Sequence, residues 1–460
     1  MTMINNALSG ALAARAALAV TSQNIANLQT QGYTRQGILL RAAAPTGNAG
    51  YSPGNGVQTP QLIRFADAYK SQQLWESAST QGRHAGVQTY LTQLERVMGD
   101  DVSTINGGLD SFYAALNAAS VEPTSLPLRQ QVIASAEALT VRFNSVNQVL
   151  ANQRTAITQQ RSAAVDQINV LSNEIAMLNG QIAGAGATGT NPSSLIDERD
   201  NRIDALAALV GLNVVDQPDG SRSVSLKNGT PLVVGTTVGK LETAPPLADG
   251  TPALSVKFAR ETFTLASRDL GGQLGGLDDY QAKTLQPLIL SISDMATGLT
   301  TLFNNQLAAG FAPDGTPGKP LFQLDTSSVS AMLTITPGLT AQDLAFSSDA
   351  TKPGDSGNLL ALIGLKDQSV PISSLGTVQL GDAYTQLVSN LGTTSQQNQA
   401  ALSVAETVRS YAKANWASTS GVNEDEEAVN LVQFQQMYQA NMKVFSTANA
   451  LFDATLAILR

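Results

Sequence analysis

The sequence predicts a mainly α-helical protein with inserted β structure: an elongated helical rod, coiled-coil-like terminal helices from both chain ends, and a β-rich domain inserted in two pieces. Two observations favour this fold. Apolar residues recur every seven positions in long segments, as in helices that pack along one another. Two interior segments instead show the alternating pattern of β-strands. The 460 residues suffice for two or three domains.

Residues 1–35 are predicted to form an N-terminal axial helix. Its apolar stripe contains five residues, four of them spaced by seven: Ile4, Leu8, Ala11, Leu18 and Ile25. The helix should end near Asn27, because Gln31-Gly32-Tyr33 is typical of a turn. Residues 36–60 are rich in Gly, Pro and Ala and are predicted to be a loop.

The rod is predicted to come from three helical segments, 61–210, 272–310 and 354–422. Its longest helix should run from about Pro127 to Ile182, where apolar rows keep a spacing of seven. Such a helix is about 80 Å long at 1.5 Å per residue, so it must belong to an elongated bundle.

The β domain is predicted from residues 211–271 and 311–353. In the first piece, Asn228-Gly229 is the hairpin turn between two alternating segments. In the second piece, the residues spaced by two are Val329, Ala331, Leu333 and Ile335. The glycine-rich segment 271–276 lacks the strand-loop-helix context of a dinucleotide site and is interpreted as a flexible junction between domains.

Residues 423–460 are predicted to form a C-terminal axial helix. Asn423 should cap it, Glu426 completes a capping box, and the acids at 424–427 suit the positive end of the helix dipole. Its apolar stripe contains Leu431, Phe434, Tyr438, Phe445, Phe452 and Leu459. Such rows at both chain ends predict packing between subunits. The alternative is an amphipathic surface helix at each end, packed on the chain's own core.

Composition argues against several classes of function. The net charge is −9 with scattered basic residues, which argues against a nucleic-acid surface. Cys is absent and His84 is the single His, so a thiolate nucleophile and the usual zinc sites are excluded. The acids at 197–200 and 278–279 lie at helix starts, where the dipole explains them. No catalytic, cofactor-binding or metal-binding residue is predicted, and no cofactor.

Membrane insertion is not predicted, because no apolar run is expected to reach transmembrane length. Polar residues and Arg15 interrupt the N-terminal apolar stretch, and a basic leader is missing, so a cleaved signal peptide is not predicted either. An extracellular role would need a signal-independent export route.

Specific motifs at both chain ends point to one family. The N-terminal motif resembles the signature of bacterial flagellar rod, hook and hook-associated proteins, with Gln31 in place of a proline; it comprises Asn24, Ile25, Ala26, Asn27, Thr30, Gly32 and Tyr33. The segment 420–440, with its Asp-Glu-Glu and Phe-Gln-Gln elements, is similar to the hook-associated members in particular. Gly271–Leu277 and Gly354–Leu362 resemble interior patterns of the same family.

The resemblance implies a non-enzymatic structural subunit of the extracellular flagellum, at the junction between hook and filament. Its implied partners are further copies of itself, the hook protein and a filament-side hook-associated protein. The resemblance also implies that the chain leaves the cell by flagellar type III export, without cleavage of its N-terminus. It also implies an export chaperone on the C-terminal helix, whose aromatic stripe should form the binding site: Leu431, Phe434, Tyr438, Phe445 and Phe452.

Two alternatives remain open from the sequence. One is another axial protein of the flagellum: a hook, rod or filament-side junction protein. The other is a secreted carbohydrate-acting enzyme with helical tails, which is disfavoured because no paired carboxylates lie in a recognisable cleft pattern.

Overall fold

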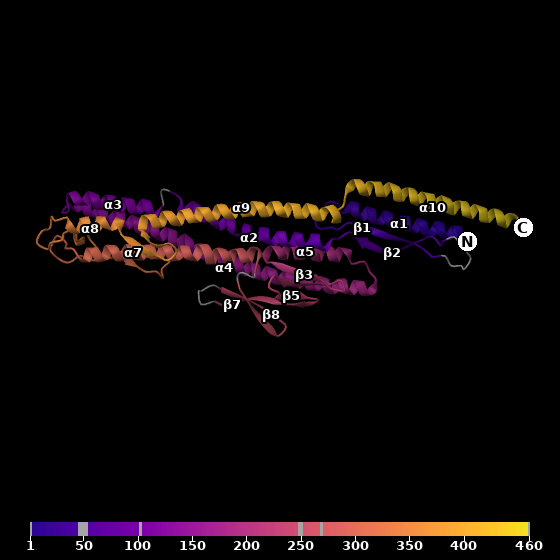
Figure 1. Ribbon diagram of the computed structural model, residues 1–460, viewed down its shortest axis with the longest axis horizontal. Coiled ribbons are helices and arrows are strands. Elements are labelled where there is room, and N and C mark those ends of the chain that lie inside the picture. The colour runs from indigo at the N-terminus through magenta and orange to yellow at the C-terminus, as the bar shows by residue number, and fades with distance from the viewer. Residues whose placement is uncertain (1, 45–53, 101–103, 247–251, 267–269, 459–460) are drawn as a thin grey trace.

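The computed structural model describes residues 2–44, 54–100, 104–246, 252–266 and 270–458. The molecule is elongated, with long helices side by side along its axis and small antiparallel sheets attached to them (Figure 1). A pair of terminal helices extends from one end of the rod, and both chain ends lie there. The predicted mainly α fold, with inserted β structure and long terminal helices, is confirmed.

The rod is organised around one helix, α4 (Leu126–Thr188), whose 63 residues span about 95 Å. Pro127 lies in its first turn, where a backbone donor is not needed. Gly189 ends the helix with a φ of 72°, a left-handed conformation that suits glycine. The predicted long helix is therefore confirmed and continues beyond Ile182. Its two halves lie in two different hydrophobic cores.

The distal core lies at the end of the rod away from the terminal helices and is formed by α3 (Ile105–Val121), the first half of α4, α7 (Gln286–Ala308) and α8 (Gly357–Gly364). The ring centroid of Phe112 lies 5.0 Å from that of Phe303 and 5.9 Å from that of Phe322. Short elements close this end: β10 (Phe322–Leu324), β11 (Leu333–Ile335), η3 (Ala341–Asp343), η4 (Leu365–Asp367), β12 (Ser369–Ile372) and β13 (Gly376–Gln379).

The second predicted β piece lies in this distal core. β10 and β11 form a two-stranded sheet of their own, with Phe322 opposite Ile335. β11 begins at Leu333, so Val329 and Ala331 precede the strand. Phe322 and Leu333 are buried in the core that the helices form. A spacing of two therefore also suits an irregular segment that covers a helical surface. The two β pieces therefore do not form one domain.

The other core lies between the second half of α4, α5 (Ser193–Leu209) and two antiparallel sheets. One sheet has the order β3 (Leu212–Asp216), β4 (Arg222–Leu226), β5 (Pro231–Val234) and β6 (Thr237–Val238). The second has the order β7 (Lys240–Pro246), β8 (Pro252–Phe258) and β9 (Glu261–Leu265). Val224 and Leu226 are buried, and Gly229 turns before β5 with a φ of 90°, so the predicted hairpin is confirmed.

The glycine-rich segment after these sheets is tightly packed. It forms α6 (Gly272–Tyr280), which lies against α2 (Ala68–Met98). A Cβ atom on Gly276 would lie 2.2 Å from the carbonyl oxygen of Arg83, and one on Gly272 would lie 2.4 Å from the carbonyl carbon of Leu209. The glycines thus let helices touch through their backbones, so the interpretation as a flexible junction is wrong. A π-helical turn, η2 (Gln281–Leu285), joins α6 to α7.

A buried polar layer separates the two cores. Arg161 of α4 pairs with Asp278 of α6 at 2.6 Å, and both side chains are almost fully buried. On the distal side of this pair, Gln153 donates to the carbonyl of Tyr90 and accepts from the Tyr280 hydroxyl at 2.7 Å. An ion pair in this layer, rather than a helix dipole, therefore accounts for the acid at position 278.

The terminal unit consists of α1 (Thr2–Ala26), α10 (Glu424–Ile458) and a hairpin of β1 (Gln36–Ala42) and β2 (Val57–Arg64). α9 (Leu380–Ser420) runs back along the rod and leads into α10. The predicted loop over 36–60 is wrong for the described residues, and the next helix begins at Ala68 rather than at 61. The glycines and prolines that suggested a loop are concentrated between 45 and 56 in the sequence, and residues 45–53 lie outside the described residues.

Helix α1 could cross a membrane by length and composition alone: Met3–Ala26 has a mean hydropathy of 1.2. It is the one helix in the described part of the chain that meets this criterion, which signal sequences and core helices also meet. The expectation that no segment reaches transmembrane length is thus wrong for α1. Its many alanines raise the mean hydropathy without a run of large apolar side chains.

Candidate functional site: the terminal helix pair and its joint with the rod

The helices α1 and α10 form an antiparallel pair with small side chains at their contact. Asn24 near the end of α1 bonds Glu427 at the start of α10 at 3.2 Å. Farther along, a Cβ on Gly10 would lie 2.3 Å from the Asn441 Oδ1. Buried residues of α1 include Ala7, Ala11, Ala14, Ala17 and Thr21. Small side chains allow close helix packing, so this contact buries few large apolar groups.

The large apolar side chains predicted for packing mostly lie at the edge of this contact or outside it. Leu8 is 46% exposed, Tyr438 36% and Phe452 57%. Among the others, Ala11 is buried, Ile4, Leu18, Phe434 and Phe445 are half-buried, Ile25 and Leu431 are exposed, and Leu459 lies outside the described residues. The outer surface of the pair therefore carries much of the apolar area.

The row of α10 that faces α1 is displaced from the predicted row. The buried or half-buried residues recur at intervals of three and four: Glu427, Asn430, Phe434, Met437, Asn441, Phe445 and Ala448. Leu431 and Tyr438 lie one position beyond this row and stay accessible. α10 also extends past the beginning of α1 (Figure 1). Because Gly10 lies against Asn441 in this antiparallel pair, Phe452 lies beyond the first residue of α1.

Asn24 of the N-terminal motif is the central hydrogen-bonding residue of the joint between the terminal unit and the rod. Its Nδ2 donates to the Gln36 carbonyl at 2.9 Å, and its Oδ1 accepts from the Gln36 backbone N–H at 3.0 Å. The same Oδ1 accepts from the Tyr33 hydroxyl at 2.9 Å. Only a carboxamide side chain supplies a donor and an acceptor in this way. Asn24 thereby fixes the start of β1 beside the end of α1.

Arg35 connects this motif to the first turn of α10. Its Nε lies 2.7 Å from Glu427 Oε1 and its Nη1 lies 2.6 Å from Glu426 Oε2. Glu427 is 1% exposed, so this charge-assisted contact is largely shielded from water. Asn423 caps α10 as predicted, because its Oδ1 accepts from the backbone N–H of Asp425 and of Glu426. The Glu426 carboxylate binds Arg35, in place of the reciprocal bond of a capping box.

Two acids of α5 tie the hairpin to the rod. Asp197 accepts from the Thr34 backbone N–H at 3.0 Å and pairs with Arg64 at 2.6 Å. Asp200 pairs with Arg64 at 3.2 Å and also with Arg199 and Arg222. Burial lowers the pKa of Arg199 to about 10, which still leaves it charged at neutral pH. The helix dipole, which explained these acids from the sequence, is therefore not their main partner.

The turn after α1 requires the glycine of the motif. Gly32 has a φ of 76°, and a Cβ there would lie 2.0 Å from the Asn201 Oδ1. Thr30 closes the preceding turn by donating its Oγ1 to Asn27 Oδ1 at 3.1 Å and its backbone N–H to the Asn27 carbonyl at 2.9 Å. Ile25 and Ala26 are exposed and take no part in these bonds. The motif thus specifies the path of the chain out of α1.

Two short segments connect the terminal unit to the rod, residues 65–67 and 421–423, and residues 27–35, which join α1 to β1, lie beside them. They bond to one another, because the Arg35 N–H donates to the Ser420 carbonyl at 2.8 Å and the Phe65 N–H donates to the Arg35 carbonyl at 3.0 Å. This meeting point could not be predicted from the sequence, since its members are far apart in the chain. Arg35 alone, next to the motif, offered a clue.

The joint has the chemistry of a structural ion-pair network. In the described part of the chain, no group of three or more His, Cys, Asp or Glu residues is placed to hold a metal ion. His84, the single His, is half-buried between two helices, and its Nδ1 lies 2.8 Å from Asn398 Oδ1 of α9. The chain's two tryptophans, Trp75 and Trp416, line a pocket of about 330 Å³ beside the joint.

Comparison with known proteins gives consistent matches. The model of the flagellar hook-associated protein FlgK helical domain matches residues 91–322, and that of the flagellar basal body rod FlgEFG protein C-terminal matches 415–458. Flagellar hook-associated protein 1 of Salmonella typhimurium is 30% identical, over 99% of this chain and 100% of the relative. The Escherichia coli protein of that name is 28% identical over the same shares, and the Bacillus subtilis protein is 26% identical over 96% and 95%.

A solved structure has a similar fold. The flagellar hook junction protein FlgK from Burkholderia pseudomallei aligns with a TM-score of 0.64 and 17% identity, over 75% of this chain and 99% of that one. The relatives that match nearly the whole chain all have the name of one hook-associated protein. These names disfavour the alternative that the chain is a hook, rod or filament-side junction protein.

Proposed function

This chain belongs to the family of flagellar hook-associated protein 1, structural proteins of the bacterial flagellum, and on that premise we propose that its terminal helix pair makes the contacts between copies at the junction of hook and filament. The proposed role is mechanical and non-enzymatic. The partners are neighbouring copies, the hook protein on one side and a filament-side hook-associated protein on the other.

The observation that supports this role is the outward position of large apolar side chains on the terminal pair. A fully buried side chain of this kind stabilises a contact by about 1.5–3 kcal/mol. Leu8, Leu12, Leu431, Tyr438 and Phe452 are all more than a third exposed in the isolated chain. Neighbouring copies that cover them would gain this free energy on assembly.

Tyr438→Asp and Phe452→Asp test the proposal, because each places a charge in the contact between copies. We expect a strain with either variant to make hooks that lack filaments, seen by electron microscopy, while the purified variant melts at the wild-type temperature. A matched control is Val215→Asp, which alters an exposed valine of β3 and should leave filaments intact. Normal filaments with Tyr438→Asp and Phe452→Asp would refute the role of the helix pair.

We also propose that an export chaperone binds α10 before the chain leaves the cell uncleaved. Its site is the stripe of Leu431, Phe434, Tyr438, Phe445 and Phe452. Phe434 and Phe445 are half-buried in the contact with α1, so a chaperone that covers the whole stripe must compete with α1. A chain ending at Val422 should lose binding, whereas deletion of residues 1–30 should tighten it, as measured by calorimetry with the chaperone. Weaker binding after the N-terminal deletion would place part of the site on α1.

A further inference from the structure

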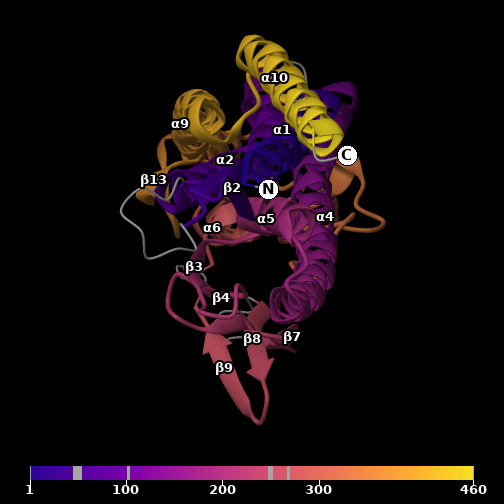
Figure 2. The ribbon, with the colours of Figure 1, turned by 90° about the vertical axis from the view of Figure 1, so that its right-hand side faces the viewer.

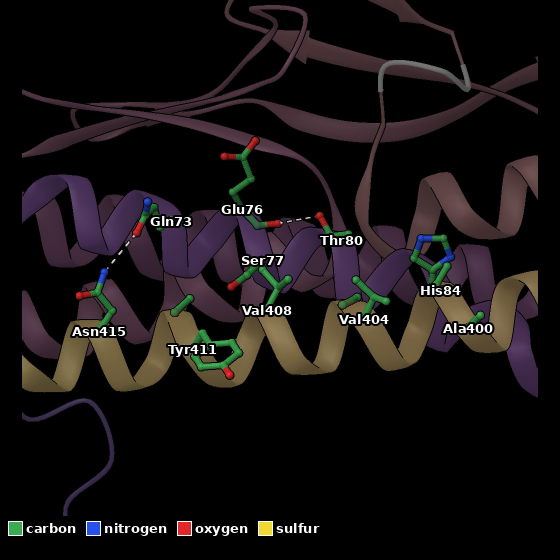
Figure 3. Close-up of a pocket in the computed structure, with 13 residues that line it drawn as sticks. Gln73, Glu76, Ser77, Thr80, His84, Ala400, Val404, Val408, Tyr411 and Asn415 are labelled. Carbon is green, nitrogen blue, oxygen red and sulfur yellow. Dashed lines mark hydrogen bonds between the residues drawn. The ribbon is translucent and has the colours of Figure 1, made fainter.

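A long groove between α2 and α9 opens on the flank of the rod next to the joint (Figure 3). Its volume is about 880 Å³, and small side chains such as Ala401 and Ala405 lie along it. Three larger apolar side chains follow one another along α9: Val404 is 64% exposed, Val408 51% and Tyr411 73%. An exposed apolar row beside a groove is typical of a protein-binding surface.

The surface of α9 is free of charge over a long stretch that includes one end of the groove, at Ala400 to Val404, whereas Glu406 and Lys413 lie exposed farther along it. No residue between Asp382 and Glu406 is charged, although many residues there are exposed. Charged residues are depleted at the centres of interfaces between proteins. α9 also leads directly into α10, so a contact through the terminal helices would continue onto this flank.

The outer face of α4 offers a matching surface. Val170 and Met177 are 55% and 58% exposed and lie seven residues apart, as do Val404 and Tyr411. This part of α4 shares a core with Trp75 of α2, so its outer row lies at the same level along the rod as the groove. Figure 2 shows α9 and α4 on opposite flanks. Surfaces on opposite flanks can repeat the same contact from copy to copy, which closes a ring when the rotation fits.

We propose that the groove between α2 and α9 binds the outer face of α4 from a second copy of this chain. Val170 and Met177 of one copy pack against Val404, Val408 and Tyr411 of the next. This inference rests on the proposed function, which sets several copies around one axis, and it adds a contact outside the terminal helices. A peptide or small molecule in the groove would leave Val170 and Met177 equally exposed, so a second copy accounts for both surfaces.

Cysteine cross-linking tests the contact, because the natural chain contains no Cys. Val170→Cys and Val408→Cys are combined in one chain and expressed in a strain that lacks the natural protein. Purified flagella are treated with a short bis-maleimide, and linked chains are detected by immunoblot. We expect a series of dimers and higher multimers, and only monomers when the same protein is treated in dilute solution.

The control combines Val408→Cys with Val121→Cys, an exposed valine at the far end of α3. It should not give multimers, because Val121 lies at a different level of the rod. If the chain is present in flagella but the Val170 and Val408 pair gives no multimers, or both pairs link equally, the lateral contact is refuted while the proposed function stands. If the chain is absent from flagella, both proposals fail.

A charge in the groove gives an independent test. Val408→Asp should lower the amount of the chain in purified flagella about tenfold, a change equivalent to about 1.4 kcal/mol, with no change in monomer melting. Ser410→Asp is the matched control, since it adds the same charge to another face of α9 and should assemble normally. Normal incorporation of Val408→Asp, or an equal loss with Ser410→Asp, would overturn the inference.

Discussion

The rod and the terminal pair are both built from long helices, but they bury opposite kinds of side chain. In the rod, Phe112, Phe143 and Phe303 are at most 1% exposed. In the terminal pair, the buried residues of α1 are mostly alanines, while Leu12 and Phe452 are more than half exposed. Both regions have apolar rows spaced by seven, so spacing alone does not separate a core from an interface.

This difference indicates where each region gets its stability. The rod is stabilised by large side chains within one chain, whereas the contact between α1 and α10 has less apolar area and depends on the polar joint at its base. Isolated helices are marginal in water. The terminal pair is therefore suited to completion by neighbouring copies, which replace the solvent on its outer surface.

The largest expected difference is in the response to truncation of aromatic side chains. Phe112→Ala should reduce the free energy of unfolding of the monomer by about 3–5 kcal/mol, because it leaves a cavity in the distal core. Tyr438→Ala should change it by at most about 0.5 kcal/mol, as is usual for exposed positions. Urea unfolding of the purified monomers measures both. Equal losses would show that the terminal pair is a core like the rod.

A smaller effect should separate the joint from the rod. Glu427→Gln removes a buried charge that binds Arg35, and should destabilise the terminal pair by about 1–3 kcal/mol. Glu426→Gln should cost at most about 1 kcal/mol, because that carboxylate is exposed. Amide hydrogen exchange of the monomer should become faster in α1 and α10 and stay unchanged in α4. Faster exchange throughout the rod would mean that the two regions unfold together.

The smallest effect concerns pH. Burial, together with the charges of Asp197 and Glu427, raises the pKa of Tyr33 from 10 to about 12. As the pH rises, the Tyr33 hydroxyl ionises earlier in the unfolded chain than in the folded chain. Its contribution to folding stability is therefore complete below about pH 10 and is lost between about pH 10 and 12. The fluorescence of Trp75 and Trp416 beside the joint should follow this loss, and Tyr33→Phe should abolish it. An unchanged titration in Tyr33→Phe would assign the transition to another group.

The helices could be predicted because their apolar spacing is a local property of the sequence. The rows identified α4 and both terminal helices, but they did not show which face of α10 meets α1. Phe434 and Tyr438 lie only four residues apart, and their different exposure depends on the angle at which α1 approaches. Such an angle results from packing of the whole unit.

The joint could not be predicted because its residues come from separate parts of the chain. Asp197 and Glu427 are each at a helix start, where a local explanation was sufficient. Only the fold brings them together with Arg64 and Arg35. The glycines of α6 were misinterpreted for a similar reason, since glycine allows both flexibility and close packing, and the sequence does not contain the neighbour that decides between them.

The continuity of α4 determines how the molecule can deform. One unbroken helix runs through both cores, so these cores cannot swivel about each other without breaking its backbone hydrogen bonds. The terminal unit, in contrast, is attached by two short segments, 65–67 and 421–423, and by the ion pair between Arg64 and Asp197. We therefore expect the rod to move as one rigid body relative to the terminal unit. Differences in curvature between adjoining structures would then be accommodated where the two meet.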